Sequence, residues 1–158
     1  MSLLLQTICF SQNIKTKVQN IDKIIDESEV DYSDIPVRSS KNFLLVKTCI
    51  EANKDTIYFY QDTVKFKLVK ITIGVFNPHH LRDLKEDYWT YYFLKENLIM
   101  ATNGHIRDFG RVYSFTNYYF ENRKCIYRFG AKYNLQTDKW ILKHSYSYLG
   151  RMKGLACM

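Results

Sequence analysis

The stretch Tyr91-Tyr92-Phe93-Leu94-Lys95-Glu96-Asn97-Leu98-Ile99 recurs 27 residues later as Tyr118-Tyr119-Phe120-Glu121-Asn122-Arg123-Lys124-Cys125-Ile126. In both copies three aromatic residues precede a short polar segment, and apolar residues follow it. Two runs of strand-forming residues around a polar centre are typical of a β-hairpin. The repeat therefore predicts two antiparallel hairpins.

A two-residue turn at the centre of each copy gives the two hairpins a consistent register. We place these turns at Lys95-Glu96 and Asn122-Arg123. The turns then pair Phe93 with Leu98, Phe120 with Cys125, and Glu121 with Lys124. The last pair places opposite charges across the two strands, which favours this register.

Strict alternation of side chains divides residues 88–129 between two faces of a sheet. The predicted core face carries Trp89, Tyr91, Phe93, Leu98, Met100, Val112, Tyr118, Phe120, Cys125, Tyr127 and Phe129. The opposite face carries Tyr88, Tyr92, Ile99, Arg111, Tyr113, Phe115, Tyr119, Ile126 and Arg128. This second face is predicted to be mixed, with aromatic and basic residues.

The flanking segments complete an α+β prediction. Residues 13–28 have apolar residues at helical spacing, and residues 43–50, 56–61 and 65–75 are predicted strands. Asn77-Pro78 predicts a short helix over residues 78–86, because Asn caps a helix and Pro fits its first turn.

The C-terminal segment has apolar residues at Leu142, Tyr146, Leu149 and Met152, which favours a helix capped at Thr137 or Asp138. A strand over residues 140–152 remains an alternative, because Tyr146-Ser147-Tyr148 alternates. We expect one domain over residues 13–158: an N-terminal helix, an antiparallel meander of about six or seven strands, and a C-terminal helix packed on one face.

The net charge of +7 is distributed unevenly along the 158 residues. Residues 13–63 carry seven Lys or Arg and nine Asp or Glu, whereas residues 64–158 carry sixteen and seven. The basic residues are scattered, and a nucleic-acid footprint usually shows a run or stripe. The distribution therefore argues against binding to nucleic acid.

Residues 1–12 contain no charge and end in small residues, so they are similar to the end of a secretory signal peptide. Cleavage between Ser11 and Gln12 would fit, and we expect an extracytoplasmic protein, periplasmic or secreted. A buried N-terminal strand in a cytoplasmic protein is the alternative. No later apolar run approaches the ~20 residues of a membrane-spanning helix.

The cysteines and histidines show no metal-binding spacing, and we expect no metal and no cofactor. Cys49 and Cys125 are expected to be small buried strand residues. His79 and Asp83 are four residues apart, a spacing that allows an acid/base pair on a helix. His144 is a third candidate for catalysis. The phosphate-binding and nucleophile motifs that mark many enzymes are absent from the sequence.

The sequence therefore favours a non-catalytic binding or protein-interaction module that uses the aromatic and basic face. Its partner would be a protein or a small molecule, and the same face could form a homodimer. The predicted binding residues are Tyr92, Arg111, Tyr113, Phe115, Tyr119 and Arg128. The alternatives are a small hydrolase or ligand-binding enzyme with a cleft using His79, Asp83 or His144, and an inhibitor or immunity-type protein.

Overall fold

The structure, a computed structural model, describes residues 2–28, 43–50, 56–62, 68–74, 86–107, 111–130 and 136–154. The elements are α1 (Ser2–Ser28), β1 (Phe43–Ile50), β2 (Thr56–Asp62), β3 (Leu68–Gly74), β4 (Glu86–Leu94), β5 (Asn97–Arg107), β6 (Arg111–Glu121), β7 (Lys124–Gly130) and α2 (Asp138–Lys153). The predicted α+β fold is confirmed.

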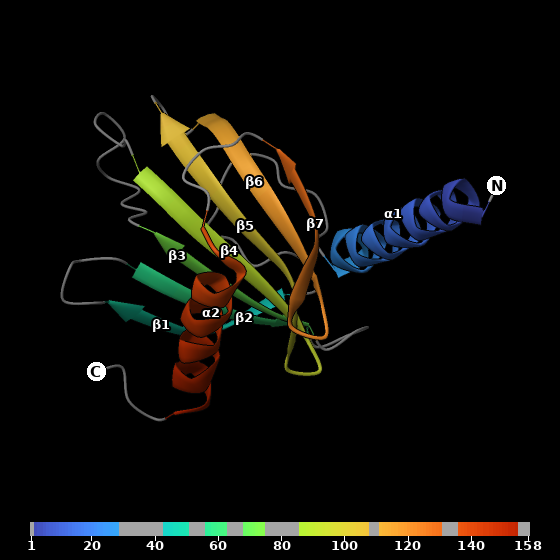
Figure 1. Ribbon diagram of the computed structural model, residues 1–158. Coiled ribbons are helices and arrows are strands. Elements are labelled where there is room, and N and C mark those ends of the chain that lie inside the picture. The colour runs from blue at the N-terminus through green and yellow to red at the C-terminus, as the bar shows by residue number, and fades with distance from the viewer. Residues whose placement is uncertain are drawn as a thin grey trace.

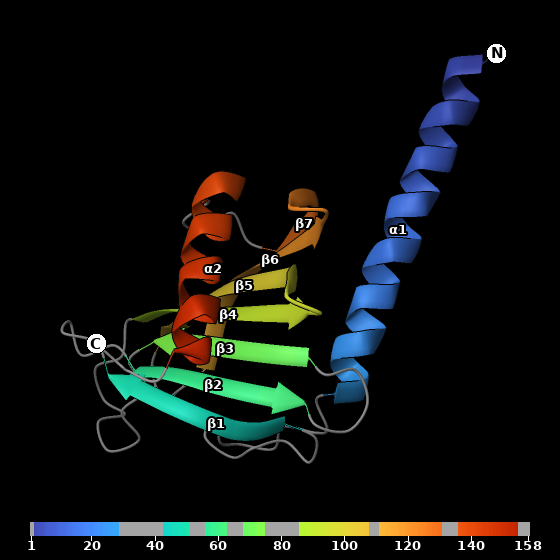
Figure 2. The same ribbon diagram turned by 90° about the horizontal axis from the view of Figure 1, so that it is seen from below.

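The seven strands form one sheet in the order β1-β2-β3-β4-β5-β6-β7, and each pair of neighbours is antiparallel. Helix α2 packs on one face of this sheet and α1 on the other. The N-terminal half of α1 projects beyond the sheet past β7 (Figures 1 and 2). No helix in the described part of the chain is both long enough and apolar enough to cross a membrane.

The helix boundaries agree with the sequence in part. Helix α1 includes residues 13–28 but begins at Ser2. Helix α2 settles the open alternative for residues 140–152, and its N-cap is Thr137, whose side chain accepts a hydrogen bond from the Trp140 amide. The predicted helix over residues 78–86 lies outside the described residues, except for Glu86, which begins β4.

Both predicted hairpins form with the predicted turns and pairings. The four turn residues Lys95, Glu96, Asn122 and Arg123 have φ of 49°, 65°, 50° and 61°. Positive φ at both central residues defines the type I′ turn, whose twist matches that of the strands. Each non-glycine residue in this conformation costs roughly 1–2 kcal/mol, with Asn the best tolerated.

The prediction of side-chain faces fails immediately after each turn. In the first hairpin Phe93 pairs with Leu98 but Tyr92 pairs with Met100, so Ile99 is an extra residue in a β-bulge. Ile126 occupies the same position in the second hairpin. A bulge reverses the alternation beyond it, because two residues on one strand oppose one on the other.

The two bulges move four residues to the face opposite the predicted one. Met100 packs with Tyr92 and Tyr119 on the α1 face, and Tyr127 and Phe129 pair with Tyr119 and Asn117 on that face. Arg128 moves to the α2 face, where its guanidinium carbon lies 4.9 Å from the centre of the Tyr118 ring and Nη2 lies 3.7 Å from Oδ1 of Asp138.

The larger core lies between the sheet and α2. Six predicted core residues are buried there: Trp89, Tyr91, Phe93, Leu98, Tyr118 and Phe120. Helix α2 adds Ile141, Tyr148 and Leu149 to the same cluster. Burying one large apolar side chain stabilises a fold by about 1.5–3 kcal/mol, so this cluster holds α2 on the sheet.

Candidate functional site

A groove of about 920 Å³ lies on the other face, between α1 and the strands β6 and β7. Its floor is formed by Phe115, Asn117, Tyr119, Tyr127 and Phe129. Its wall is formed by Ile14, Lys15, Val18, Gln19, Asp22 and Asp26 of α1. Lys15, Gln19, Asp22 and Asp26 follow one another at intervals of four, three and four residues, so they lie along one side of the helix.

The floor of the groove is aromatic and partly open to solvent. Phe115 and Phe129 are 42% and 54% exposed, and the centres of their rings are 6.4 Å apart. Tyr119 and Tyr127 form a second pair, with ring centres 5.8 Å apart. Tilted rings at these separations support each other, so the floor is a connected aromatic surface.

Three polar contacts join α1 to the sheet. The Tyr119 hydroxyl donates a hydrogen bond to Oδ1 of Asp22 at 2.9 Å, and Nζ of Lys17 lies 2.6 Å from Oε2 of Glu121. At the end of the helix the Ser28 hydroxyl lies 3.2 Å from Oδ2 of the buried Asp62. The first contact lies inside the groove and joins its wall on α1 to its floor on β6.

Burial shapes the proton affinity of this contact. The pKa of Asp22 is raised, chiefly because burial disfavours the carboxylate. The hydrogen bond from Tyr119 lowers this pKa, and a smaller repulsion from Asp26 raises it. Burial, followed by the hydrogen bond to Asp22, raises the pKa of Tyr119 to about 12. At neutral pH the phenol therefore remains the donor.

The predicted binding residues do not all meet. Tyr92, Phe115 and Tyr119 share the α1 face, but Tyr92 and Tyr119 are largely covered by the helix and only Phe115 is exposed. Arg128 lies on the opposite face. Arg111 and Tyr113 belong to β6, and their side chains lie outside the described part of the molecule.

The described floor of the groove is aromatic, and a basic residue of the same face, Lys70, lies away from it, with Nζ 5.7 Å from the centre of the Tyr92 ring. Sequence reasoning missed Tyr127 and Phe129, because the bulge at Ile126 reverses their direction. It also missed the polar stripe on α1, which faces the groove only because α1 crosses the sheet at this point. The charges that line the groove are Lys15, Asp22 and Asp26.

His144, a candidate for catalysis, is packed among aromatic side chains. Its ring stacks on Trp140 with centres 4.3 Å apart and contacts Tyr148 at 4.9 Å. Nδ1 of His144 lies 2.5 Å from the hydroxyl of Tyr91, which is fully buried. Burial raises the pKa of Tyr91, so this hydroxyl stays protonated. His79 and Asp83 lie outside the described residues.

Cys49 and Cys125 were expected to be small buried strand residues, and both lie in strands. Cys49 is buried and disulfide-bonded, whereas Cys125 is a free, partly buried thiol. Within the described chain no three His, Cys, Asp or Glu side chains gather as ligands for a metal ion.

We compared the chain with protein-family models, with curated protein sequences and with solved structures, and none of these comparisons gave a match.

Proposed function

We propose that this protein is a non-catalytic binding module whose groove between α1, β6 and β7 holds a segment of a partner protein. The observation that carries the proposal is the aromatic floor, where Phe115 and Phe129 remain about half exposed beside a fixed helical wall. Aromatic residues dominate binding hot spots because they offer a large, rigid contact area at a low entropic cost.

The dimensions of the groove suit an extended peptide. Ile14 and Asp26 lie at the two ends of the wall, and twelve residues of helix span about 18 Å. An extended chain rises about 3.3 Å per residue, so five or six residues would fill this length. The apolar floor would hold alternate side chains, and the polar stripe of α1 would orient the backbone.

The charges of the wall suggest a basic residue in the bound segment. Asp22 and Asp26 lie one helical turn apart, and Lys15 lies at the other end. Because Tyr119 fixes Asp22 with a single hydrogen bond, the carboxylate has acceptor capacity left for a ligand. A Lys or Arg near one end of the segment would complement these carboxylates.

We further propose that the protein acts outside the cytoplasm. The uncharged N-terminal residues 1–12 support this proposal, and so does the disulfide at Cys49. Disulfides persist in oxidising compartments such as the periplasm and are rare in the cytosol. Sequencing the N-terminus of protein exported from its native host would test cleavage before Gln12, and a mature chain that retains residues 1–11 would contradict it.

A peptide-display selection against the purified protein tests the proposed function. Selected peptides should contain alternating apolar residues and a basic residue, and the double variant Phe115→Ala/Phe129→Ala should weaken their binding at least about tenfold. The control is Ile50→Ala, because Ile50 is 69% exposed on β1, at the far edge of the sheet. Equal binding to the double variant, or no selected peptide, would contradict the proposal.

A further inference from the structure

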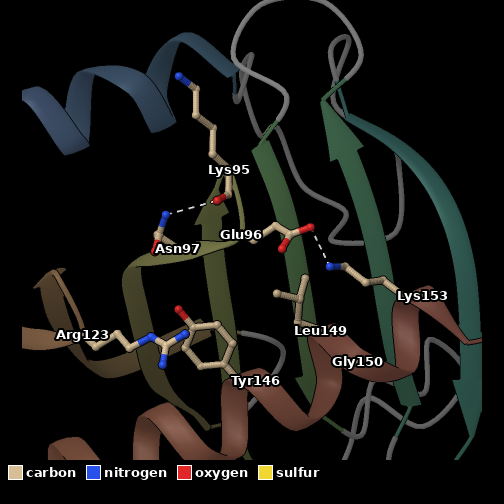
Figure 3. Close-up of a pocket in the computed structure, with 8 residues that line it drawn as sticks. All are labelled: Lys95, Glu96, Asn97, Arg123, Tyr146, Leu149, Gly150 and Lys153. Atoms are coloured by element: carbon tan, nitrogen blue, oxygen red, sulfur yellow. Dashed lines mark hydrogen bonds and ion pairs between the residues drawn. The ribbon is translucent and has the colours of Figure 1, made fainter.

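A second pocket, separate from the proposed peptide groove, lies on the α2 face of the molecule (Figure 3). The tips of both hairpin turns and the last two turns of α2 form it, and its volume is about 480 Å³. It is lined by Lys95, Glu96, Asn97, Arg123, Tyr146, Leu149, Gly150 and Lys153. This volume falls within the range of small-ligand sites.

Arg123 lies over an aromatic ring on one side of the pocket. Its guanidinium carbon is 5.2 Å from the centre of the Tyr146 ring. Tyr146 is itself held in place, because its hydroxyl accepts a hydrogen bond from the Leu98 amide at 3.3 Å and its ring meets that of Phe93 edge-on, with centres 5.5 Å apart. The stacked guanidinium is therefore pre-oriented.

The N–H edge of Arg123 is open. Among the described residues no carboxylate pairs with Arg123, and its contact there is the Tyr146 ring. A stacked guanidinium still presents donors along its edge, and this fork matches two oxygens of a carboxylate or a phosphate. Arg123 therefore has the geometry of an anion receptor.

The other charges leave the pocket positive. Glu96, the only carboxylate among the lining residues, is engaged by Nζ of Lys153 at 2.6 Å. Figure 3 shows this pair on the side of the pocket opposite Arg123, and it shows Lys95 pointing away. Gly150 adds room, because a Cβ at this position would meet no atom within 4 Å.

The backbone supplies an independent reason to assign a function to these turns. Lys95, Glu96 and Arg123 all line the pocket and all have positive φ. Type I′ turns prefer Asn-Gly, and a glycine at Glu96 or Arg123 would remove the steric cost of that conformation. Strained backbone conformations cluster at functional sites, so the absence of glycine from these turn positions is an observation that points to a function for their side chains.

We propose that this pocket binds an oxyanion, a carboxylate or a phosphate group of a small ligand, through a bidentate contact with the stacked guanidinium of Arg123. The Lys153–Glu96 ion pair would keep the only lining carboxylate from repelling the anion, and the wall at Gly150 would accommodate the body of the ligand. The site differs from the groove in its face, its charge and the class of its ligand.

Titrations of the purified protein with inorganic phosphate and with malonate, followed by amide NMR, test the proposal. We expect saturable shifts at Asn97, Arg123 and Gly150, and Arg123→Gln should weaken binding about tenfold or more, the effect of one lost charged pair. Arg123→Lys keeps the positive charge but not the two parallel N–H donors, so its affinity should lie between those of the wild-type protein and Arg123→Gln. A preference for phosphate or for malonate would identify the oxyanion.

Arg128→Gln is the matched control. Arg128 also lies over an aromatic ring on the α2 face, but it is paired with Asp138. We expect this variant to bind both probes as the wild-type protein does. Equal weakening by Arg128→Gln and Arg123→Gln would reduce the effect to net charge and overturn the proposal. The absence of saturable shifts with either probe, or unchanged binding in Arg123→Gln, would also overturn it.

Discussion

Tyr119 of β6 donates its phenolic hydrogen to Oδ1 of Asp22 on α1, with 2.9 Å between the two oxygens. The contact joins residues 97 positions apart in the chain and lies where α1 crosses the sheet. The same two residues line the proposed peptide groove. The protonation state of Asp22 therefore affects both the contact that holds α1 on the sheet and the charge of the groove.

The substitution Asp22→Asn should reduce the pH dependence of the free energy of unfolding. Because the folded state raises the pKa of Asp22, its contribution is most favourable below the unfolded pKa of about 3.9 and is lost as pH rises through the folded pKa. The amide oxygen of the substituted side chain can still accept from Tyr119, without the desolvation of a carboxylate or the repulsion by Asp26. Urea unfolding at a series of pH values from about 4 to 7 measures this difference.

Tyr119→Phe provides the opposing variant. The hydrogen bond from Tyr119 lowers the pKa of Asp22, so its loss should raise that pKa further and extend the pH-dependent region upward.

Asp22→Asn should be at least as stable as the wild-type protein at pH 7. A clear loss of stability there would mean that the ionised carboxylate stabilises the fold and would contradict the assigned direction.

The sequence predicted most of the fold because its strongest signals are local. The repeated stretch carries both turn and register, and the pairings of Phe93 with Leu98 and Phe120 with Cys125 follow from it. The bulges at Ile99 and Ile126 were not predicted, because strict alternation assumes that each residue on one strand pairs with one residue on the next. This one error moved Arg128 to the wrong face and concealed Tyr127 and Phe129.

The groove was harder to predict than the sheet because it depends on a tertiary contact. The apolar spacing of residues 13–28 predicts a helix, but it does not say which strands the helix crosses. The aromatic floor was partly predicted through Phe115 and Tyr119. Its wall of Asp22 and Asp26 could be assigned only when α1 was seen against β6 and β7.

A pair of glycine substitutions should have opposite effects on stability. A Cβ at Gly104 would clash with Cε1 of Tyr88, whose ring covers this residue on the neighbouring strand. Gly104→Ala should therefore cost about 1–3 kcal/mol, as overpacking does. Gly150→Ala is the matched control, since its methyl group meets nothing within 4 Å and should stabilise α2 by about 0.5–1 kcal/mol. Denaturant unfolding measures both, and equal signs would contradict the packing assigned to Tyr88.

The two described cysteines should respond differently to alkylation and substitution. In native protein without reductant, iodoacetamide should leave Cys49 unmodified, because its sulfur is in a disulfide. Cys49→Ser should cost about 2–5 kcal/mol, the usual effect of losing a native disulfide. Cys125→Ser is the control, because Cys125 is a free thiol on β7, and its effect should be small. Peptide mass mapping of the alkylated protein checks whether Cys49 is protected, and an alkylated Cys49 in protein kept without reductant would contradict the disulfide.

The two turns allow a reciprocal exchange that isolates backbone strain. The first central residue is Lys95 in one turn and Asn122 in the other, at φ of 49° and 50°. Asn tolerates this conformation better than Lys does, so Lys95→Asn should stabilise the protein by about 0.5–1 kcal/mol and Asn122→Lys should destabilise it by a similar amount. Neither side chain makes a hydrogen bond or an ion pair with other described residues, so the exchange breaks no polar contact there.

Thermal and urea unfolding of both variants and of the double exchange give the measurement. The two side chains share no contact partner, so their effects should cancel nearly completely in the double exchange. Destabilisation by Lys95→Asn would show that the lysine side chain stabilises the turn, and the positive φ at this position would then carry no net cost.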